Sequence, residues 1–291
     1  MGLKFEDNCT MVISTCDAYE DLWDPFFKIL AYTWPDIDIP VVLNTEHKTY
    51  CTENISKLRV HNQKGEGELS WSKRLKDTLE DIDSKYIIFM LDDFFAKSPI
   101  DVARIRQCFE WMEADKRVAV FSFMQTKREG NKPSKMYEGF EKRPRCGDYI
   151  YNCQAALWNR QCLIDALADN ENPWQWELLG SYRAYRDFGH DYYSLMPESG
   201  YVIDYIDFIR GRALGGLPVC RGRWYMDCVA PIFDKYGVQV DYSIRGEITA
   251  DEIVPAQESI DGAQSLRHMA GRPYHYLRRR VENIIHIIKG Y

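Results

Sequence analysis

Residues 86–95 read YIIFMLDDFF, an apolar and aromatic run that leads directly into two adjacent carboxylates. An unbroken apolar run of this length is typical of a strand buried on both faces, as in a parallel sheet. Asp92 and Asp93 would then follow the strand at the carboxyl edge of the sheet, where open α/β sheets bind their ligands. Adjacent carboxylates repel each other, and a cation between them and a substrate relieves that repulsion. The stretch therefore predicts a metal-and-phosphate site, although these ten residues alone fit an ordinary acidic turn better.

The first 125 residues alternate between patterns typical of strands and of helices. Short apolar runs bounded by polar residues indicate strands, and apolar residues at three- and four-residue spacing indicate amphipathic helices. The alternation predicts an α/β fold with a mostly parallel central sheet and helices on its faces. Strands are expected over residues 9–15, 39–43, 58–60, 86–91 and 118–123, and helices over residues 21–32, 71–82 and 100–112.

The rest of the chain is less regular. Residues 126–147 are basic and interrupted by Gly and Pro, which predicts a mobile lid, and residues 211–224 form a second basic, Gly-rich loop. Residues 273–289 predict an amphipathic helix whose apolar stripe lies beside several Arg residues. That helix would contact an anionic membrane surface, pair with a second copy or pack on its own domain. Further strands are expected over residues 149–158 and 201–209, and helices over residues 160–168 and 172–186.

Composition limits the classes of function. Apolar residues make up 45% of the chain and charged residues 28%, as in globular proteins, and the net charge of −7 argues against nucleic-acid binding over the whole surface. The nine cysteines contain no C-x-x-C pair, so neither a zinc ribbon nor a thioredoxin-like motif is supported and a reducing compartment fits best. No signal-peptide core opens the chain and no apolar run is long enough to cross a membrane. A cytoplasmic protein is expected.

Several stretches form an ordered set of motifs between about residues 9 and 225. They are STCD at 14–17, GELSWSKRL at 67–75, LDDF at 91–94, QAALW at 154–158 and NPWQWE at 172–177. In this order they resemble the nucleotide-sugar glycosyltransferases of the GT-A fold, particularly bacterial enzymes of capsule and O-antigen synthesis.

The resemblance implies an organisation and an activity. Residues 1–245 would form a GT-A-like, Rossmann-like domain, with a nucleotide-binding half up to about residue 125 and an acceptor and catalytic half over 126–245. Residues 246–291 would form a C-terminal helical extension. Such an enzyme moves a sugar from a nucleoside-diphosphate sugar, here expected to be a UDP-sugar, to a hydroxyl of a glycan or lipid-linked saccharide. A divalent cation, Mn²⁺ or Mg²⁺, would stabilise the charge on the departing diphosphate.

The family holds this cation with an Asp-x-Asp motif after a buried strand. By resemblance, Asp92 would contact the ribose or the sugar, and Asp93 would bind the metal. The acid in the third position is missing, because that position is Phe94. This departure leaves open which aspartate binds the metal and whether a metal is needed.

An inverting transferase also needs a general base that deprotonates the acceptor hydroxyl. Glu177 is the candidate, because it follows two Trp residues near a helix start, where family members often carry such an acid. Its apolar neighbours would raise its pKa by desolvation. An ordinary first-turn glutamate, favoured by the helix dipole, is an equally good interpretation. Asp187 and Asp191 are the reserve candidates.

Other polar and aromatic side chains lie where the donor or acceptor would bind, at expected strand exits and in the two loops. Plain turn chemistry explains the strand-exit residues as well, and a surface charge or a core position would explain the others. The candidates for donor binding are Thr15, Asp17, Asn44, Glu46, Trp71, Arg74, Asp92, Arg221 and Arg223, and those for sugar or acceptor binding are Gln154, Trp158 and Trp176.

Three other functions remain open. A glycoside hydrolase would use Asp93 and Glu177 as its acid and base, but it would leave the basic loops unexplained. A nucleotidyltransferase shares the architecture and the metal carboxylates, but normally has a Gly-rich basic loop after its first strand, where this chain has CDAY at residues 16–19. A non-catalytic protein that binds nucleotide sugars would keep the fold without turnover.

Overall fold

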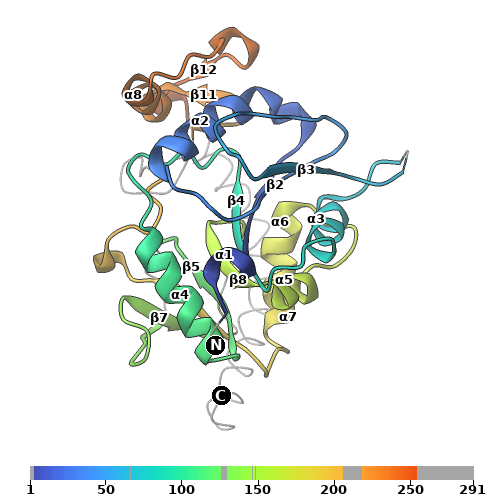
Figure 1. The fold of residues 1–291 in the computed structure, drawn as a ribbon, viewed down its shortest axis with the longest axis vertical. Helices are drawn as coiled ribbons and strands as arrows, with labels where there is room; N and C mark the ends of the chain where they lie inside the picture. The colour runs from blue at the N-terminus through green and yellow to red at the C-terminus, as the bar shows by residue number, and fades with distance from the viewer. Residues whose placement is uncertain are drawn as a thin grey trace. The chain divides into compact units, whose positions relative to one another are not determined.

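The computed structural model describes residues 3–65, 67–125, 130–145, 147, 149–205 and 218–253. The chain divides into two compact units, Met1–Asp204 and Tyr205–Tyr291, each of which is described by itself. The first unit contains a nine-stranded sheet in the order β3-β2-β1-β4-β8-β5-β9-β7-β6 (Figure 1). Its strands are β1 (Cys9–Ser14), β2 (Val41–Thr45), β3 (Leu58–Asn62), β4 (Tyr86–Leu91), β5 (Val118–Ser122), β6 (Lys132–Pro133), β7 (Phe140–Arg143), β8 (Ala156–Asn159) and β9 (Asp191–Leu195).

The sheet is parallel in its first half and mixed in its second. Strands β3, β2, β1 and β4 are parallel, whereas β8 runs antiparallel between β4 and β5. β9 pairs parallel with β5, and the β6–β7 hairpin closes that edge. The chain moves outward from β1 to β2 and β3, and then returns to place β4 on the other side of β1. The boundary between β1 and β4 is therefore a topological switch point, where such sheets bind ligands.

Helices cover both faces of this sheet. On one face α3 contacts α5, and Leu75 and Leu79 of α3 join Leu163 of α5 in one buried cluster. On the other face Phe109 of α4 packs edge-on against Tyr86 of β4, with ring centroids 5.3 Å apart. The α-helices of this unit are α1 (Phe5–Asn8), α2 (Trp23–Thr33), α3 (Trp71–Glu80), α4 (Val102–Ala114), α5 (Arg160–Ala166), α6 (Pro173–Gln175) and α7 (Ser181–Ala184).

Side-chain caps define where α3 and α4 begin. The Ser70 hydroxyl accepts a hydrogen bond from the Lys73 N–H at 3.2 Å and starts α3, and the Asp101 carboxylate accepts one from the Arg104 N–H at 2.9 Å and starts α4. Such caps satisfy backbone donors that the first helical turn leaves unpaired. The start of α3 is thereby fixed directly beside the carboxyl ends of the parallel strands.

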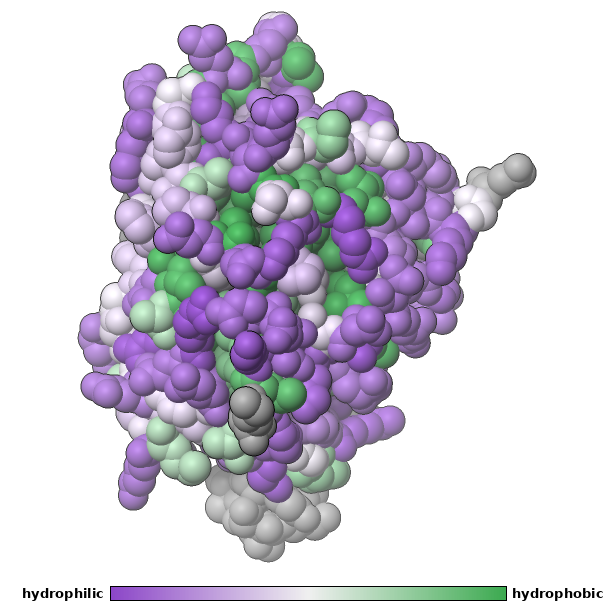
Figure 2. All heavy atoms as spheres, in the orientation of Figure 1, coloured by the Kyte–Doolittle hydropathy of each residue, from purple (hydrophilic) through white to green (hydrophobic). Residues whose placement is uncertain are grey.

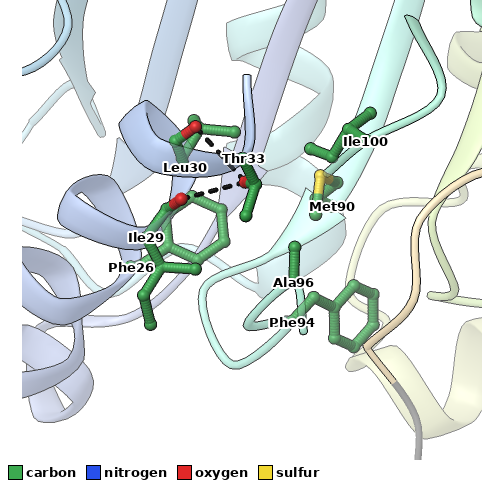
Figure 3. A pocket seen from close by; sticks show the side chains of 8 residues that line it. All are labelled: Phe26, Ile29, Leu30, Thr33, Met90, Phe94, Ala96 and Ile100. Atoms are coloured by element: carbon green, nitrogen blue, oxygen red, sulfur yellow. Dashed lines mark hydrogen bonds between the residues drawn. The ribbon is translucent and has the colours of Figure 1, made fainter. Parts of the chain in front are cut away.

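A small apolar pocket lies between α2 and the turn that follows β4 (Figure 3). The gap between its lining side chains is too narrow for a water molecule. Its only polar lining residue is Thr33, whose hydroxyl donates a hydrogen bond to the carbonyl of Ile29 at 2.9 Å within α2. The pocket is therefore apolar packing behind the Asp92–Asp93 turn. Its lining residues are Phe26, Ile29, Leu30, Thr33, Met90, Phe94, Ala96 and Ile100.

The described part of the second unit is a small three-stranded sheet with one helix, α8 (Met226–Tyr236). Its strands are β10 (Val219–Cys220), β11 (Arg223–Tyr225) and β12 (Glu247–Ile248). The buried Trp224 ring packs edge-on against Phe233 of α8. The expected helix over residues 273–289, and most of the expected C-terminal extension, lie outside the described residues.

The α/β architecture and the parallel first half confirm the prediction from sequence, whereas several details of the second half differ from it. Of the expected strand 149–158, only residues 156–158 lie in a strand, which is β8. Residues 132–143 form the β6–β7 hairpin at a sheet edge, where a loop is expected. β9 is an unpredicted strand, and residues 201–205 of the expected strand 201–209 are not in a strand.

Hydrophilic side chains cover most of the face in Figure 2, with apolar ones toward its middle. Within the described residues, no helix is long and apolar enough to span a membrane.

Candidate functional site

A polar contact joins the exits of β1 and β4 at the switch point. Thr15 follows β1 and donates its hydroxyl hydrogen to the carboxylate of Asp92, which follows β4. The Trp23 indole N–H in turn donates to the Thr15 hydroxyl at 2.9 Å. Ser14 and Leu91 are paired in register, so both exits leave the sheet at the same level. The two residues predicted to bind the donor therefore meet, and both are buried.

The Glu177 side chain contacts the backbone of Cys153, which lies in the loop before β8. The Glu177 carboxylate accepts the backbone N–H of Cys153 at 2.9 Å. Burial raises the pKa of the Cys153 thiol well above its usual value, and the negative charges of Glu177 and Asp93 raise it further. Both charges therefore act on the same buried thiol. The hydrogen bond to Cys153 places Glu177 beside the segment that precedes β8.

Glu177 lies in a π-helical turn, Trp176–Gly180, between α6 and α7. A capping box starts α6, in which Asn172 and Gln175 each bind the other's backbone N–H at 2.9 Å. π-helical turns are rare and are frequently found at functional sites. The sequence predicts one continuous helix here, and nothing in the sequence signals the extra residue.

Asp17 and Glu46 tie together the loops that follow β1 and β2. The Asp17 carboxylate accepts the backbone N–H groups of Glu46 at 3.1 Å, His47 at 3.0 Å and Lys48 at 3.1 Å. Glu46 returns the contact by accepting the Asp17 N–H at 2.8 Å. These bonds make Asp17 an organiser of the loops, and its contact with a base or ribose stays a prediction.

Arg74 of α3 is almost fully buried and points back toward the strand exits. Its guanidinium donates to the carbonyl of Thr15 at 2.8 Å and to the carboxylate of Glu46 at 3.1 Å. Asn44 is also buried, and its amide nitrogen donates to the Thr78 hydroxyl on the same helix at 2.6 Å. Both residues join α3 to the exits of β1 and β2, and their contact with a donor stays a prediction.

The three tryptophans predicted to face a ligand have different environments. Trp71 is half-buried, donates its indole N–H to the Ser14 hydroxyl at 2.9 Å and packs against Trp176. Trp158 and Trp176 have relative exposures of 1% and 0%, and both belong to the buried cluster beneath α3 and α5. Trp176 also donates to the carbonyl of Ala166 at 3.0 Å. Trp158 and Trp176 are therefore core residues, which corrects their assignment to sugar or acceptor contact.

The other predicted residues are divided between the two units. Gln154 is half-buried and precedes β8, whose first residue pairs with the end of β4, so it lies at the carboxyl edge. Arg221 and Arg223 belong to the second unit. Arg221 has a left-handed φ of 54°, and Arg223 donates to the carbonyl of Glu247 at 3.1 Å and pairs with Glu252. Their contact with a diphosphate stays a prediction.

The two reserve acids have different surroundings. Asp191 begins β9, which runs parallel to β5, and it pairs with Lys142 at 2.8 Å and Arg145 at 3.4 Å. It therefore lies at the edge of the sheet opposite the carboxyl ends of the parallel strands. Asp187 accepts hydrogen bonds from His190 at 3.0 Å and from Tyr192 at 2.5 Å, and its role as a substitute for Glu177 stays a prediction.

The structure adds two groups that the sequence analysis missed. The backbone N–H of Cys153 holds Glu177, and the Trp23 indole N–H holds Thr15. A backbone donor leaves no signal in the residue type, and Trp23 is indistinguishable in sequence from the other apolar residues of its helix.

The carboxylates limit how a metal ion would bind. Among the residues that the structure describes, no group of three or more His, Cys, Asp or Glu side chains is placed to hold one. One oxygen of Asp92 accepts the Thr15 hydroxyl, and Asp93 lies beside it. One or two carboxylates suffice for Mg²⁺ when substrate phosphates supply the other ligands. The residues therefore fit a cation that arrives together with a diphosphate.

Comparison with known proteins gives similarity of fold alone. No protein-family model matches the chain, and neither does any curated protein. The crystal structure of S. aureus TarS 1-349 is 14% identical, with a TM-score of 0.43, and the match covers 66% of this chain and 61% of that one. This chain therefore spans less than two thirds of the TarS fragment.

Two further solved structures give similar values. The mannosyltransferase PcManGT from Pyrobaculum calidifontis, in complex with GDP-Man and Mn²⁺, is 12% identical over 98% of this chain and 76% of that one, with a TM-score of 0.44. A CMP:2-keto-3-deoxy-manno-octonic acid synthetase complexed with CTP is 12% identical over 65% and 89%, with a TM-score of 0.39. These identities and scores assign no activity.

Proposed function

We propose that this protein is a glycosyltransferase that moves a sugar from a nucleoside-diphosphate sugar to an acceptor hydroxyl. The observation that carries the proposal is the Thr15–Asp92 contact at the switch point, where Asp93 follows Asp92 in the chain. The Cys153 N–H, in the segment that reaches the same edge of the sheet, holds Glu177. Phosphate-bearing ligands bind at such switch points, and the transfer needs one acid for the donor side and one for the acceptor side.

On the donor side, Asp93 would hold a divalent cation together with the diphosphate. The bound cation would neutralise the charge that develops on the leaving diphosphate. Asp92, oriented by Thr15, would accept hydrogen bonds from hydroxyl groups of the ribose or the sugar. Arg74 supports this side indirectly, because it fixes the backbone of Thr15 and the carboxylate of Glu46.

On the acceptor side, Glu177 would take the proton of the acceptor hydroxyl as that oxygen attacks the anomeric carbon. Direct attack from the face opposite the leaving group inverts the configuration of that carbon. The Cys153 N–H would keep the carboxylate oriented while it acts as a base. A saccharide or lipid-linked saccharide of surface-polysaccharide synthesis is the acceptor to test first, and a UDP-sugar the donor.

The same two carboxylates would also serve a glycoside hydrolase as acid and base. A thermal-shift panel separates the two functions, because a ligand that binds only the folded protein raises the melting temperature. Stabilisation by a nucleoside diphosphate with Mn²⁺, lost in Asp93→Asn, supports transfer. Stabilisation by free sugars alone would replace transfer with hydrolysis.

Turnover decides between these enzymes and a binding protein. Wild-type protein, nucleotide sugars of different bases and Mn²⁺ would be assayed for release of nucleoside diphosphate, with and without acceptor. Release of pyrophosphate from a nucleoside triphosphate and a sugar would instead identify a nucleotidyltransferase. Binding without any turnover would leave a non-catalytic nucleotide-sugar protein.

A further inference from the structure

An ion pair brackets the π-helical turn that carries Glu177. Glu171 lies six residues before Glu177, and Arg183 lies six residues after it. The two guanidinium Nη atoms of Arg183 each donate to one oxygen of the Glu171 carboxylate, both at 2.7 Å. A paired contact of this kind fixes orientation as well as distance, because two parallel hydrogen bonds hold two planar groups. Glu171 is buried, so water competes little for it.

The clamp, as we term the Glu171–Arg183 pair, is anchored to the donor side of the site. The backbone N–H of Glu171 donates to the Ser72 hydroxyl at 2.9 Å, and the Glu171 carbonyl accepts the Ser72 N–H at 3.1 Å. Ser72 lies in the first turn of α3, two residues before Arg74, which binds Thr15 and Glu46. Helix α3 therefore contacts both the loops that follow β1 and β2 and the start of the segment that contains Glu177.

The other face of the turn is fixed by close packing. Trp176 and Arg183 both donate to the carbonyl of Ala166, at 3.0 and 2.8 Å. The Tyr151 ring stacks on Trp176 with an interplanar angle of 13°. A Cβ atom at Gly180 would lie 2.7 Å from the Tyr151 ring, so a glycine is required for this approach. The turn is held at both ends and along one side.

A π-helical turn contains one residue more than the α-helical turn that would replace it. Successive residues of an α-helix are rotated by about 100°, so relaxation to an α-helix would turn Glu177 by roughly that angle relative to the end that stays fixed. Such a rotation would remove the Glu177 carboxylate from the Cys153 N–H. Fixing both ends of the segment prevents this relaxation.

We propose that the Glu171–Arg183 clamp is a positioning device that holds the π-helical turn and thereby aims Glu177 at the acceptor. The catalytic part of this inference rests on the proposed function, in which Glu177 is the base. The structural part does not, because the Cys153 N–H reports the position of the Glu177 carboxylate whether or not the protein is an enzyme.

The test uses the full chain and the double variant Glu171→Gln/Arg183→Met. Removing both charges together avoids leaving one of them buried without its partner. Hydrogen exchange of the Cys153 amide is expected to accelerate about tenfold or more, since its acceptor moves away, while amides of β1 and β4 keep their protection. In an active enzyme kcat would fall about a hundredfold with the donor KM unchanged.

Two further variants make the test decisive. Arg183→Lys keeps the charge but not the paired geometry, so intermediate exchange and an intermediate kcat are expected. If the double variant does not fold, the exchange rate of the Cys153 amide in Arg183→Lys tests the positioning role instead. Arg106→Met is the control, because it breaks the ion pair of Arg106 with Glu6 between α4 and α1. It should change neither the exchange rate of the Cys153 amide nor kcat.

Unchanged exchange at Cys153 in the folded clamp variants would overturn the positioning role, even if transfer slows. Failure of wild-type protein to turn over any nucleotide sugar would instead overturn the proposed function, while the exchange measurement would still judge the clamp.

Discussion

Replacing Thr15 by valine tests the contact at the switch point most directly. Valine has nearly the shape of threonine but neither donates nor accepts a hydrogen bond. The change therefore removes the bond from Thr15 to the buried Asp92 carboxylate and the acceptor of the Trp23 indole N–H, while the packing is nearly kept. Trp23 is fully buried, so water cannot replace that acceptor.

The cost follows from these two bonds. A hydrogen bond to a charged group contributes about 1.5–3 kcal/mol, and a buried donor left without an acceptor costs about 1–3 kcal/mol. The free energy of unfolding should therefore fall by about 2.5–6 kcal/mol. Thr15→Ser keeps the hydroxyl and loses one methyl group, which should cost only about 1 kcal/mol.

Urea unfolding followed by tryptophan fluorescence measures this difference. With a slope of about 3 kcal/mol per molar urea, the midpoint of the valine variant should fall by about 1–2 M and that of the serine variant by far less. Donor binding should weaken in the valine variant only, because Asp92 loses the bond that orients it. Equal midpoints for the valine and serine variants would refute the idea that this hydroxyl holds the two strand exits together.

Three other predictions concern single residues. Asp93→Asn should lower transfer at least about a hundredfold in the presence of Mn²⁺, and a wild-type rate would exclude Asp93 as the metal ligand. Glu177→Gln should slow transfer but leave donor affinity, measured by calorimetry, nearly unchanged, whereas lost affinity would make Glu177 a donor contact. The hydrogen bond to Asp187, followed by one to Cys162, raises the pKa of His190 to about 10. Burial alone would raise the pKa of Asp187, but bonds from His190 and Tyr192 outweigh it and lower that pKa to about 2. The His190 contribution to stability should therefore be complete below pH 6.5 and be lost as the pH rises toward 10, and the Asp187 contribution should be lost as the pH falls from about 4 toward 2. Urea midpoints from pH 3 to 10 should show this dependence in wild-type protein and a flatter curve in His190→Gln.

The sequence predicted the parallel half of the sheet because burial on both faces leaves an unmistakable pattern. Residues 86–91 contain no charged side chain, and β4 occupies this range. β9 reads DYYSL and β6 is only Lys132–Pro133, so neither has the continuous apolar run or the alternation that marks a strand. These strands form because neighbouring strands pair with them, and pairing between distant segments is not encoded in either segment alone.

The sequence predicted which residues form the candidate site better than it predicted what each of them contacts. Thr15 and Asp92 come from separate parts of the chain and form a hydrogen bond at the switch point, and Glu177 is bound by the Cys153 N–H. The roles of Asp92, Asp93 and Glu177 stay predictions. The sequence could not tell that Trp158 faces the core, because a tryptophan suits a sugar platform and a buried cluster equally well. A shift of the strand by one residue would place this side chain on the opposite face of the sheet. Only the packed structure fixes the register of the strand.

The antiparallel insertion of β8 has an evolutionary consequence. The residues proposed to bind the donor follow the ends of β1, β2 and β4, whereas Cys153 and Gln154 reach the same edge from the segment before β8. The two sets of loops therefore belong to strands of opposite direction, and no loop of one set lies in a segment that connects two strands of the other set. Changing the length or sequence of the loop before β8 would leave the register of the parallel strands intact. Under the proposed function, a lineage with this fold would change its acceptor by altering one loop while its donor stays the same.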